Sequence, residues 1–73
     1  MAEEILSTTT VYKHLQYTLR VVRLGNGKLR VFILAKNYKR RGGGVRPLYS
    51  IPAPVLKHFL KILRENKIPI PAP

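Results

Sequence analysis

Residues 16–38 read QYTLRVVRLGNGKLRVFILAKNY, two runs of β-forming residues joined by a glycine-rich turn. Asn-Gly between apolar runs is the strongest short-range signal for a β-hairpin. A two-residue loop would put the apolar sets of the two arms on opposite faces, whereas a three-residue loop from Gly25 to Gly27 puts them on one face. Burial therefore favours the longer loop, with Gly27 in the left-handed conformation that such loops need.

This register gives the hairpin one apolar face and one mixed face, because alternate residues of a strand share a face. The apolar face pairs Tyr17 with Ala35, Leu19 with Ile33 and Val21 with Val31. The mixed face carries Gln16, Thr18, Arg20 and Val22, opposed by Arg30, Phe32, Leu34, Lys36 and Tyr38. Aromatic rings between cations on a sheet face are typical of a base-stacking platform beside a phosphate track. The alternative is that Phe32 and Leu34 pack under another strand or under the N-terminal segment.

Two further short strands are expected around the hairpin. Residues 11–14 predict a separate strand with a kink near His14 or Leu15, and residues 1–7 are expected to fray. Residues 45–51 predict an edge strand or a strand start, because Pro47 cannot donate a hydrogen bond to the ladder. The sequence therefore predicts about four antiparallel strands.

One amphipathic helix follows, with the sequence PVLKHFLKILREN and Pro54 at its first position. Its apolar residues cover an arc of roughly 160° on a helical wheel. Asn66 is predicted to cap the helix, and Pro69 prevents the helix from continuing. The arc is wider than one thin sheet needs, so we expect the same helix of a second copy to cover part of it. The alternative is that the long hairpin curls over both sides of the helix. The residues predicted at this dimer interface are Val55, Leu56, Phe59, Leu60 and Leu63.

Together these elements predict one α+β domain over residues 8–67, a four-stranded antiparallel curved sheet followed by one C-terminal helix. Residues 68–73 predict an extended Pro-rich tail. The chain has no cysteine, so no disulfide supports its small core, and two lone histidines predict no metal site. We expect no cofactor. Association into a homodimer is the remaining common way to stabilise so small a domain.

The charge is strongly positive. Fourteen Lys and Arg residues face three Glu and no Asp, for a net charge of +11. All the basic residues except Lys67 lie between Ile5 and Arg64, a stretch that contains no acidic residue. A field of one sign attracts polyanions, most often nucleic acid. The alternative is a basic protein without such a partner.

The same charge distribution argues against catalysis. Hydrolytic and phosphoryl-transfer enzymes use carboxylates to hold metal ions or move protons, and the middle of the chain has none. No nucleotide-binding glycine motif is present, so we expect a protein that is not an enzyme and has no small-molecule substrate. No apolar run approaches a membrane span and the N-terminus does not resemble a signal peptide. We therefore expect an intracellular protein, associated with nucleic acid in the cytoplasm, nucleoid or nucleus.

The basic loop NYKRRGGGVRP, residues 37–47, is a candidate binding element, since each arginine can neutralise a phosphate and three glycines let the loop adapt to it. The alternative is a disordered loop that contributes only non-specific attraction. The full set of predicted nucleic-acid-binding residues is Lys13, Arg20, Arg23, Arg30, Phe32, Lys36, Tyr38, Lys39, Arg40, Arg41 and Arg46.

The order of these elements resembles the single-stranded-DNA-binding transcriptional coactivator family known as positive cofactor four. The resemblance spans residues 11–64: QYTLRVVRLGNGKLRVFILAKNY is similar to that family's central hairpin, and VRPLYSIPAPVLKHFLKIL to its closing strand and helix. It implies a homodimer packed through its helices, with curved sheets that bind single-stranded DNA with little sequence preference. By position it implies that Tyr38 stacks on a base and that Arg23 is a basic contact.

The leading functional hypothesis is a dimeric protein that binds single-stranded nucleic acid, mainly DNA, in transcription or DNA maintenance. A second hypothesis is an architectural protein that binds duplex DNA or RNA through charge alone. A third is a basic module that docks an acidic protein partner.

Overall fold

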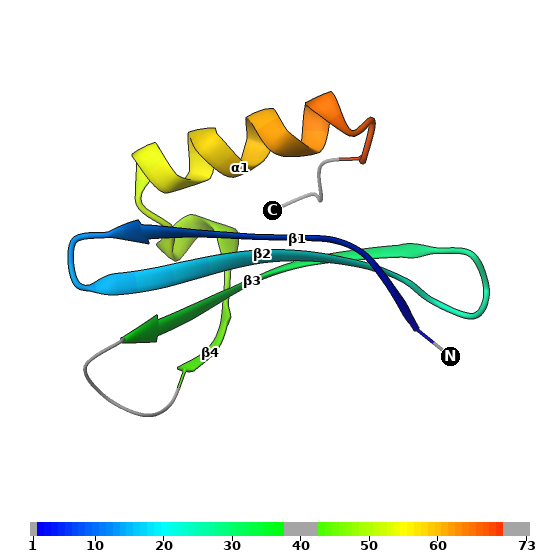
Figure 1. Cartoon of the computed structure of the whole chain (residues 1–73), viewed down its shortest axis with the longest axis horizontal. Helices are drawn as coiled ribbons and strands as arrows, with labels where there is room; N and C mark the ends of the chain where they lie inside the picture. The colour runs from blue at the N-terminus through cyan, green and yellow to red at the C-terminus, as the bar shows by residue number, and fades with distance from the viewer. Residues whose placement is uncertain (1, 38–42, 70–73) are drawn as a thin grey trace.

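The structure, a computed structural model, describes residues 2–37 and 43–69. The elements in chain order are the strands β1 (Glu3–Tyr12), β2 (Leu15–Arg23), β3 (Leu29–Asn37) and β4 (Gly43–Arg46), the 3-10 helix η1 (Leu48–Ser50) and the helix α1 (Ala53–Glu65). The strands form one antiparallel sheet in the order β1-β2-β3-β4. Helix α1 lies along one face of this sheet, and no other described element covers the opposite face (Figure 1). This confirms the predicted α+β fold. No helix within the described ranges is long and apolar enough to cross a membrane.

The β2–β3 hairpin has the predicted register. Leu19 lies opposite Ile33, and the other predicted pairs of the apolar face are also opposite each other. The Leu24 amide donates to the Lys28 carbonyl at 2.8 Å, which closes the three-residue loop. Gly27 has a φ of 83°, the left-handed conformation that glycine adopts without steric cost. Burial and turn chemistry therefore act together to set this pairing.

The N-terminal segment differs from the prediction. Residues 3–7 do not fray, because β1 begins at Glu3 and pairs with β2 along its whole length. The predicted separate strand at residues 11–14 is instead the end of β1, followed by a tight turn at Lys13 and His14. Alternate β1 residues face the helix, and Leu6 and Tyr12 pack against the core. The threonines between them are β-branched and suit a strand despite their polarity.

The fourth strand is shorter than predicted and lies earlier in the chain. It covers Gly43–Arg46, and Leu48–Ser50 form a turn of 3-10 helix in place of the predicted strand. Pro47 lies between them and ends the pairing because it lacks an N–H donor. Gly43 is required where it is, since a Cβ there would lie 2.7 Å from the Ala35 carbonyl oxygen. This contact explains why a glycine opens the strand.

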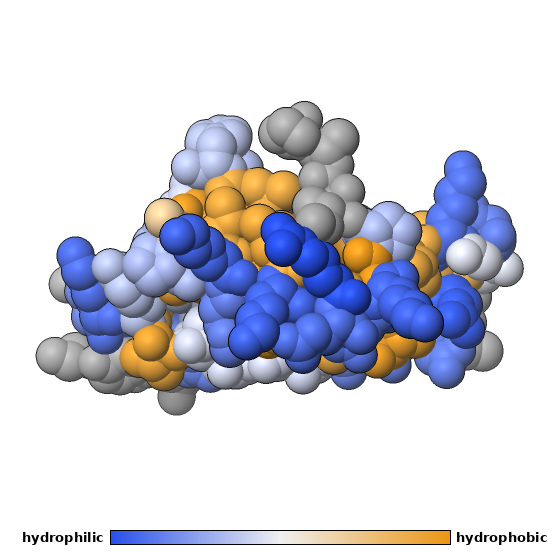
Figure 2. All heavy atoms as spheres, turned by 90° about the horizontal axis from the view of Figure 1, so that it is seen from above, coloured by the Kyte–Doolittle hydropathy of each residue, from blue (hydrophilic) through white to orange (hydrophobic). Residues whose placement is uncertain are grey.

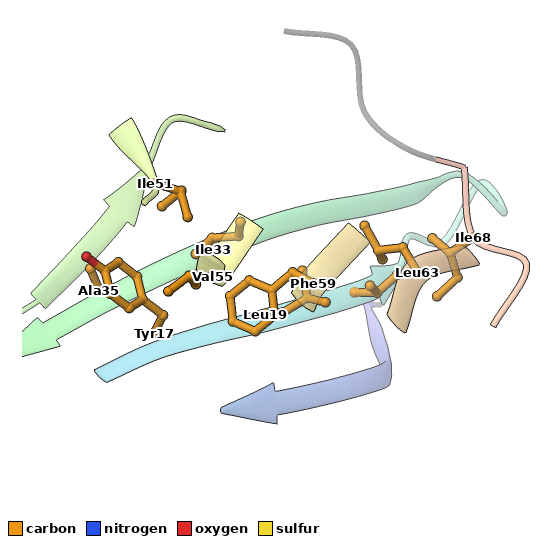
Figure 3. Close-up of a cluster of buried hydrophobic side chains, with 10 residues drawn as sticks. Tyr17, Leu19, Ile33, Ala35, Ile51, Val55, Phe59, Leu63 and Ile68 are labelled. Carbon is orange, nitrogen blue, oxygen red and sulfur yellow. The ribbon is translucent and has the colours of Figure 1, made fainter. Parts of the chain in front are cut away.

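The core lies between α1 and the sheet (Figure 3). Helix α1 begins at Ala53, one residue before the predicted start, and Pro54 lies in its first turn. Its buried residues Val55, Phe59 and Leu63 are spaced four apart and therefore line one side of the helix. They pack on the sheet against residues that include Leu19 and Val21, both fully buried.

This packing corrects the predicted dimer interface. Val55, Phe59 and Leu63 are 3%, 1% and 2% exposed within a single chain, so they are not available to a partner helix. Leu56 and Leu60, on one flank of the helix, are only half-buried. Most of the apolar side chains of α1 pack against the core of the same chain, because three strands lie side by side beneath the helix.

The C-terminus of α1 is closed by a Schellman motif. The Ile68 amide donates to the Leu63 carbonyl at 2.9 Å and the Lys67 amide to the Arg64 carbonyl at 3.0 Å, the pair of bonds that defines the motif. The Asn66 side chain also donates to the Ile62 carbonyl at 2.8 Å, which confirms its capping role. Ile68 is 8% exposed and belongs to the core, so the packed domain extends one residue beyond its predicted end at residue 67. Residues 70–73 lie outside the described part of the chain.

Lys67 occupies the position of this motif where glycine is preferred, with a φ of 56°. A side chain in this conformation costs about 1–2 kcal/mol, whereas glycine loses about 0.5–1 kcal/mol of conformational entropy on folding. We therefore expect Lys67→Gly to raise the free energy of unfolding by about 0.5–1 kcal/mol, measured by urea denaturation. Lys61→Gly, inside the helix, should lower it by about 1 kcal/mol. A Lys67→Gly protein less stable than the parent would contradict this interpretation of the cap.

Candidate nucleic-acid interface

The sheet face opposite α1, here called the open face, carries the side chains that sequence parity predicted. Its central positions are Gln16, Thr18, Arg20 and Val22 of β2, paired with Lys36, Leu34, Phe32 and Arg30 of β3. The neighbouring strands add Ser7, Thr9 and Val11 of β1 and Val45 of β4. A polar and cationic surface with apolar side chains between the cations therefore covers this face.

The centre of the open face is an aromatic ring between two arginines. The guanidinium carbon of Arg20 lies 5.6 Å from the centroid of the Phe32 ring, and that of Arg30 lies 5.8 Å away. Each contact is of the cation–π type, worth about 0.5–1 kcal/mol at an exposed site. Phe32 is half-buried, and no described element lies over it. Two like charges thus lie beside the same ring, an arrangement that a nearby anion would stabilise.

Arg20 also has an acidic partner. Its Nε lies 2.8 Å from Glu4 Oε1, and the two side chains are 38% and 44% exposed. Exposed ion pairs contribute about 0–1 kcal/mol, so a phosphate can displace this carboxylate. The pairing depends on a bulge at Ile5, between Glu4 and Leu6, which puts Glu4 opposite Val22 on the open face. Sequence reasoning missed Glu4 because the N-terminus was expected to fray.

Lys36 extends the cationic surface toward the other end of β3. It is exposed, and it lies six residues from Arg30 on the same face, or about 20 Å along the strand. A shallow groove of about 250 Å³ lies beside it, lined by Gln16, Thr18, Leu34, Ala35, Lys36, Gly43 and Gly44. Polar groups and an apolar wall thus occur together next to this lysine.

Three predicted contacts lie away from the open face. Arg46 pairs with Ile33, so it belongs to the helix side of the sheet and not to the open face. Arg23 has the same parity as Val21 and is exposed at the end of β2, beside the turn. Lys13 lies in the β1–β2 turn, where its Nζ is 5.6 Å from the centroid of the Tyr12 ring. Among the predicted residues that the structure describes, the open face therefore brings together Arg20, Arg30, Phe32 and Lys36.

Four predicted binding residues cannot be placed. Tyr38, Lys39, Arg40 and Arg41 lie outside the described residues. The structure also has an aromatic residue that the sequence did not single out: Tyr49, in η1, is 91% exposed. The sequence does not indicate that this side chain is exposed, because residues 45–51 are predicted as a strand and no periodicity marks a single 3-10 turn. In the described ranges, no three His, Asp or Glu side chains are close enough to hold a metal ion.

Comparisons with protein families, with characterised proteins and with solved structures found no match to this chain. The open face itself is therefore the basis for assigning a function.

Proposed function

We propose that this protein binds single-stranded nucleic acid, mainly DNA, on the open face, with little sequence preference. The observation that carries the proposal is the Arg20–Phe32–Arg30 cluster on a sheet face that no described element covers. Arginine and lysine side chains neutralise phosphates and release counterions. Rings and guanidinium planes stack on bases of any sequence. The role is binding rather than catalysis, and the protein would act inside the cell in transcription or DNA maintenance.

The resemblance to the positive cofactor four family supports this proposal through the order of the elements. Four antiparallel strands followed by one helix are the arrangement that the resemblance implies. In that family the sheet is the surface that binds DNA, and in this chain the sheet has an uncovered cationic face. Tyr38, which lies outside the described residues, remains a proposed stacking residue.

A second candidate is binding to duplex DNA or RNA through charge alone. It is favoured by a second basic surface on the outer side of α1, where Lys57, Lys61 and Arg64 are all exposed. Figure 2 looks onto this layer and shows hydrophilic side chains lying beside apolar surface. Within the described part of the chain, these cations have no aromatic side chain between them other than the His58 ring, so they offer phosphate contacts without stacking.

A competition titration separates the two candidates. A labelled single-stranded DNA is displaced by matched single-stranded DNA, single-stranded RNA and duplex DNA at about 50 and 200 mM salt. The proposal expects the single strands to compete more strongly than the duplex at both concentrations. Each neutralised phosphate contributes about −0.7 to the logarithmic salt slope, so the three open-face cations give about −2. Equal or stronger competition by the duplex would favour the second candidate.

Replacing Glu4 by Gln is expected to raise the affinity for single-stranded DNA about two- to fivefold, because the carboxylate competes with phosphate for Arg20. Glu65→Gln is the matched control. It removes the same charge from an exposed residue at the end of α1, on the other layer of the molecule. At physiological salt its effect on binding should be small, since charges separated by more than about 8 Å are screened. Fluorescence anisotropy measures both variants, and equal gains would show that only net charge matters.

A further inference from the structure

The two edges of the sheet are protected very differently. Strand β4 is four residues long, contains Arg46 and is followed directly by Pro47, and all three features discourage pairing with another strand. Strand β1 is ten residues long and contains no proline, lysine or arginine. A long edge of this kind presents a row of backbone N–H and C=O groups to any strand that approaches.

The regular part of the β1 edge is long enough for a stable contact. The bulge at Ile5 interrupts the register, but Leu6–Tyr12 pair with β2 without a shift, which leaves seven consecutive residues. Thr8, Thr9 and Thr10 lie at the centre of this segment, and threonines pair well across strands. Thr9 already makes such a contact within the chain, where its hydroxyl lies 3.1 Å from that of Thr18.

Charge identifies the partner. Two copies of a chain with a net charge of +11 repel each other over most of their surface. Among the four strands β1 alone lacks a basic residue, and it carries two of the three glutamates of the chain, Glu3 and Glu4. Contact along β1 is thus the approach of two copies that brings the fewest positive charges together.

We propose that β1 is a self-association edge, on which a second copy of this chain docks through its own β1 in antiparallel pairing. A twofold axis perpendicular to the sheet gives one eight-stranded sheet in the order β4-β3-β2-β1-β1-β2-β3-β4. Both helices then lie on the same side, and the two open faces form one continuous surface. This proposal does not depend on nucleic-acid binding. It also replaces the predicted helix interface, three of whose five residues are buried inside one chain.

Two equally exposed valines on the open face provide a matched test. Val11 lies in β1 and is 60% exposed, and Val45 lies in β4 and is 62% exposed. Lysine at either position adds one charge, but only Val11→Lys puts it on the proposed seam, where a lysine discourages strand pairing and each copy adds one more positive charge. In sedimentation velocity of the full chain without nucleic acid, we expect the parent to sediment as twice its 8.4 kDa mass. Val11→Lys should weaken the dimer by about tenfold or more, and Val45→Lys by less than about twofold.

Amide hydrogen exchange tests the same edge without any substitution. Exchange of the β1 amides should slow as the protein concentration rises, whereas exchange of the β4 amides should not change. The proposal is overturned by a parent that stays monomeric up to about 0.5 mM. It is equally overturned if both valine variants weaken the dimer alike, or if Leu60→Glu on α1 dissociates a dimer that Val11→Lys leaves intact.

Discussion

A Phe59→Ala protein is expected to lose about 3–5 kcal/mol of its free energy of unfolding, the usual cost of removing a buried phenyl ring. Phe59 is 1% exposed, lies at the middle of the buried side of α1 beside Leu19 of the sheet (Figure 3), and belongs to the same core cluster as Val21. A chain of this length has a total stability of roughly 4–11 kcal/mol. The single substitution therefore removes a large part of what keeps the helix on the sheet.

Urea denaturation followed by far-ultraviolet circular dichroism measures this loss at one fixed protein concentration, because association would shift the midpoint. Tyr49→Ala is the control, since it truncates an aromatic residue that is 91% exposed. Its effect should stay within about 0.5 kcal/mol. If Phe59→Ala were no more destabilising than Tyr49→Ala, this would contradict the burial of Phe59 between α1 and the sheet.

Phe32→Ala is expected to weaken single-stranded DNA binding by about 1–3 kcal/mol, a factor of roughly 5 to 150. The ring offers a stacking surface, and it also positions the guanidinium groups of Arg20 and Arg30. Binding to a duplex should change much less, because paired bases do not present their faces to the protein. Parallel titrations with a single strand and with a duplex of the same sequence measure the difference.

Two further variants separate the effect of the aromatic ring from the effect of a large apolar side chain. Phe32→Leu keeps an apolar side chain on the open face but removes the π-surface, so its affinity should fall as that of Phe32→Ala does. Phe32→Tyr keeps the ring and should bind nearly as the parent does. Full affinity in Phe32→Leu would show that the arginines suffice without stacking. Equal losses for single strand and duplex would favour binding by charge alone.

The hairpin could be predicted because its determinants are local. A loop of three residues and the apolar alternation of Leu19, Val21, Val31 and Ile33 are enough to fix its register. The first half of β1 could not be recognised in this way, since residues 3–7, with their two glutamates, look like a frayed end until β2 is present to pair with them. The width of the apolar arc on α1 was predicted, but the sequence does not say whether a sheet or a second helix covers it. Burial within one chain decides this for Val55, Phe59 and Leu63.

The candidate site, too, could be predicted only where local strand alternation determines it. Strand alternation correctly placed Arg20, Arg30, Phe32 and Lys36 on one face. The ion pair of Arg20 with Glu4 depends on a bulge that no local pattern indicates. The face of Arg46 could not be predicted, because it depends on where β4 begins, and that is set by the close contact of Gly43 with β3.

The sheet order β1-β2-β3-β4 has a consequence for how the protein is made. Every strand pairs with its neighbour along the chain, so only short loops have to close, and such topologies fold quickly. During synthesis the three long strands leave the ribosome before α1, and for that interval their apolar side has no helix to cover it. The abundance of positive charge then gives the nascent chain a means of avoiding aggregation. The same lysines and arginines thus serve the polypeptide before it is complete.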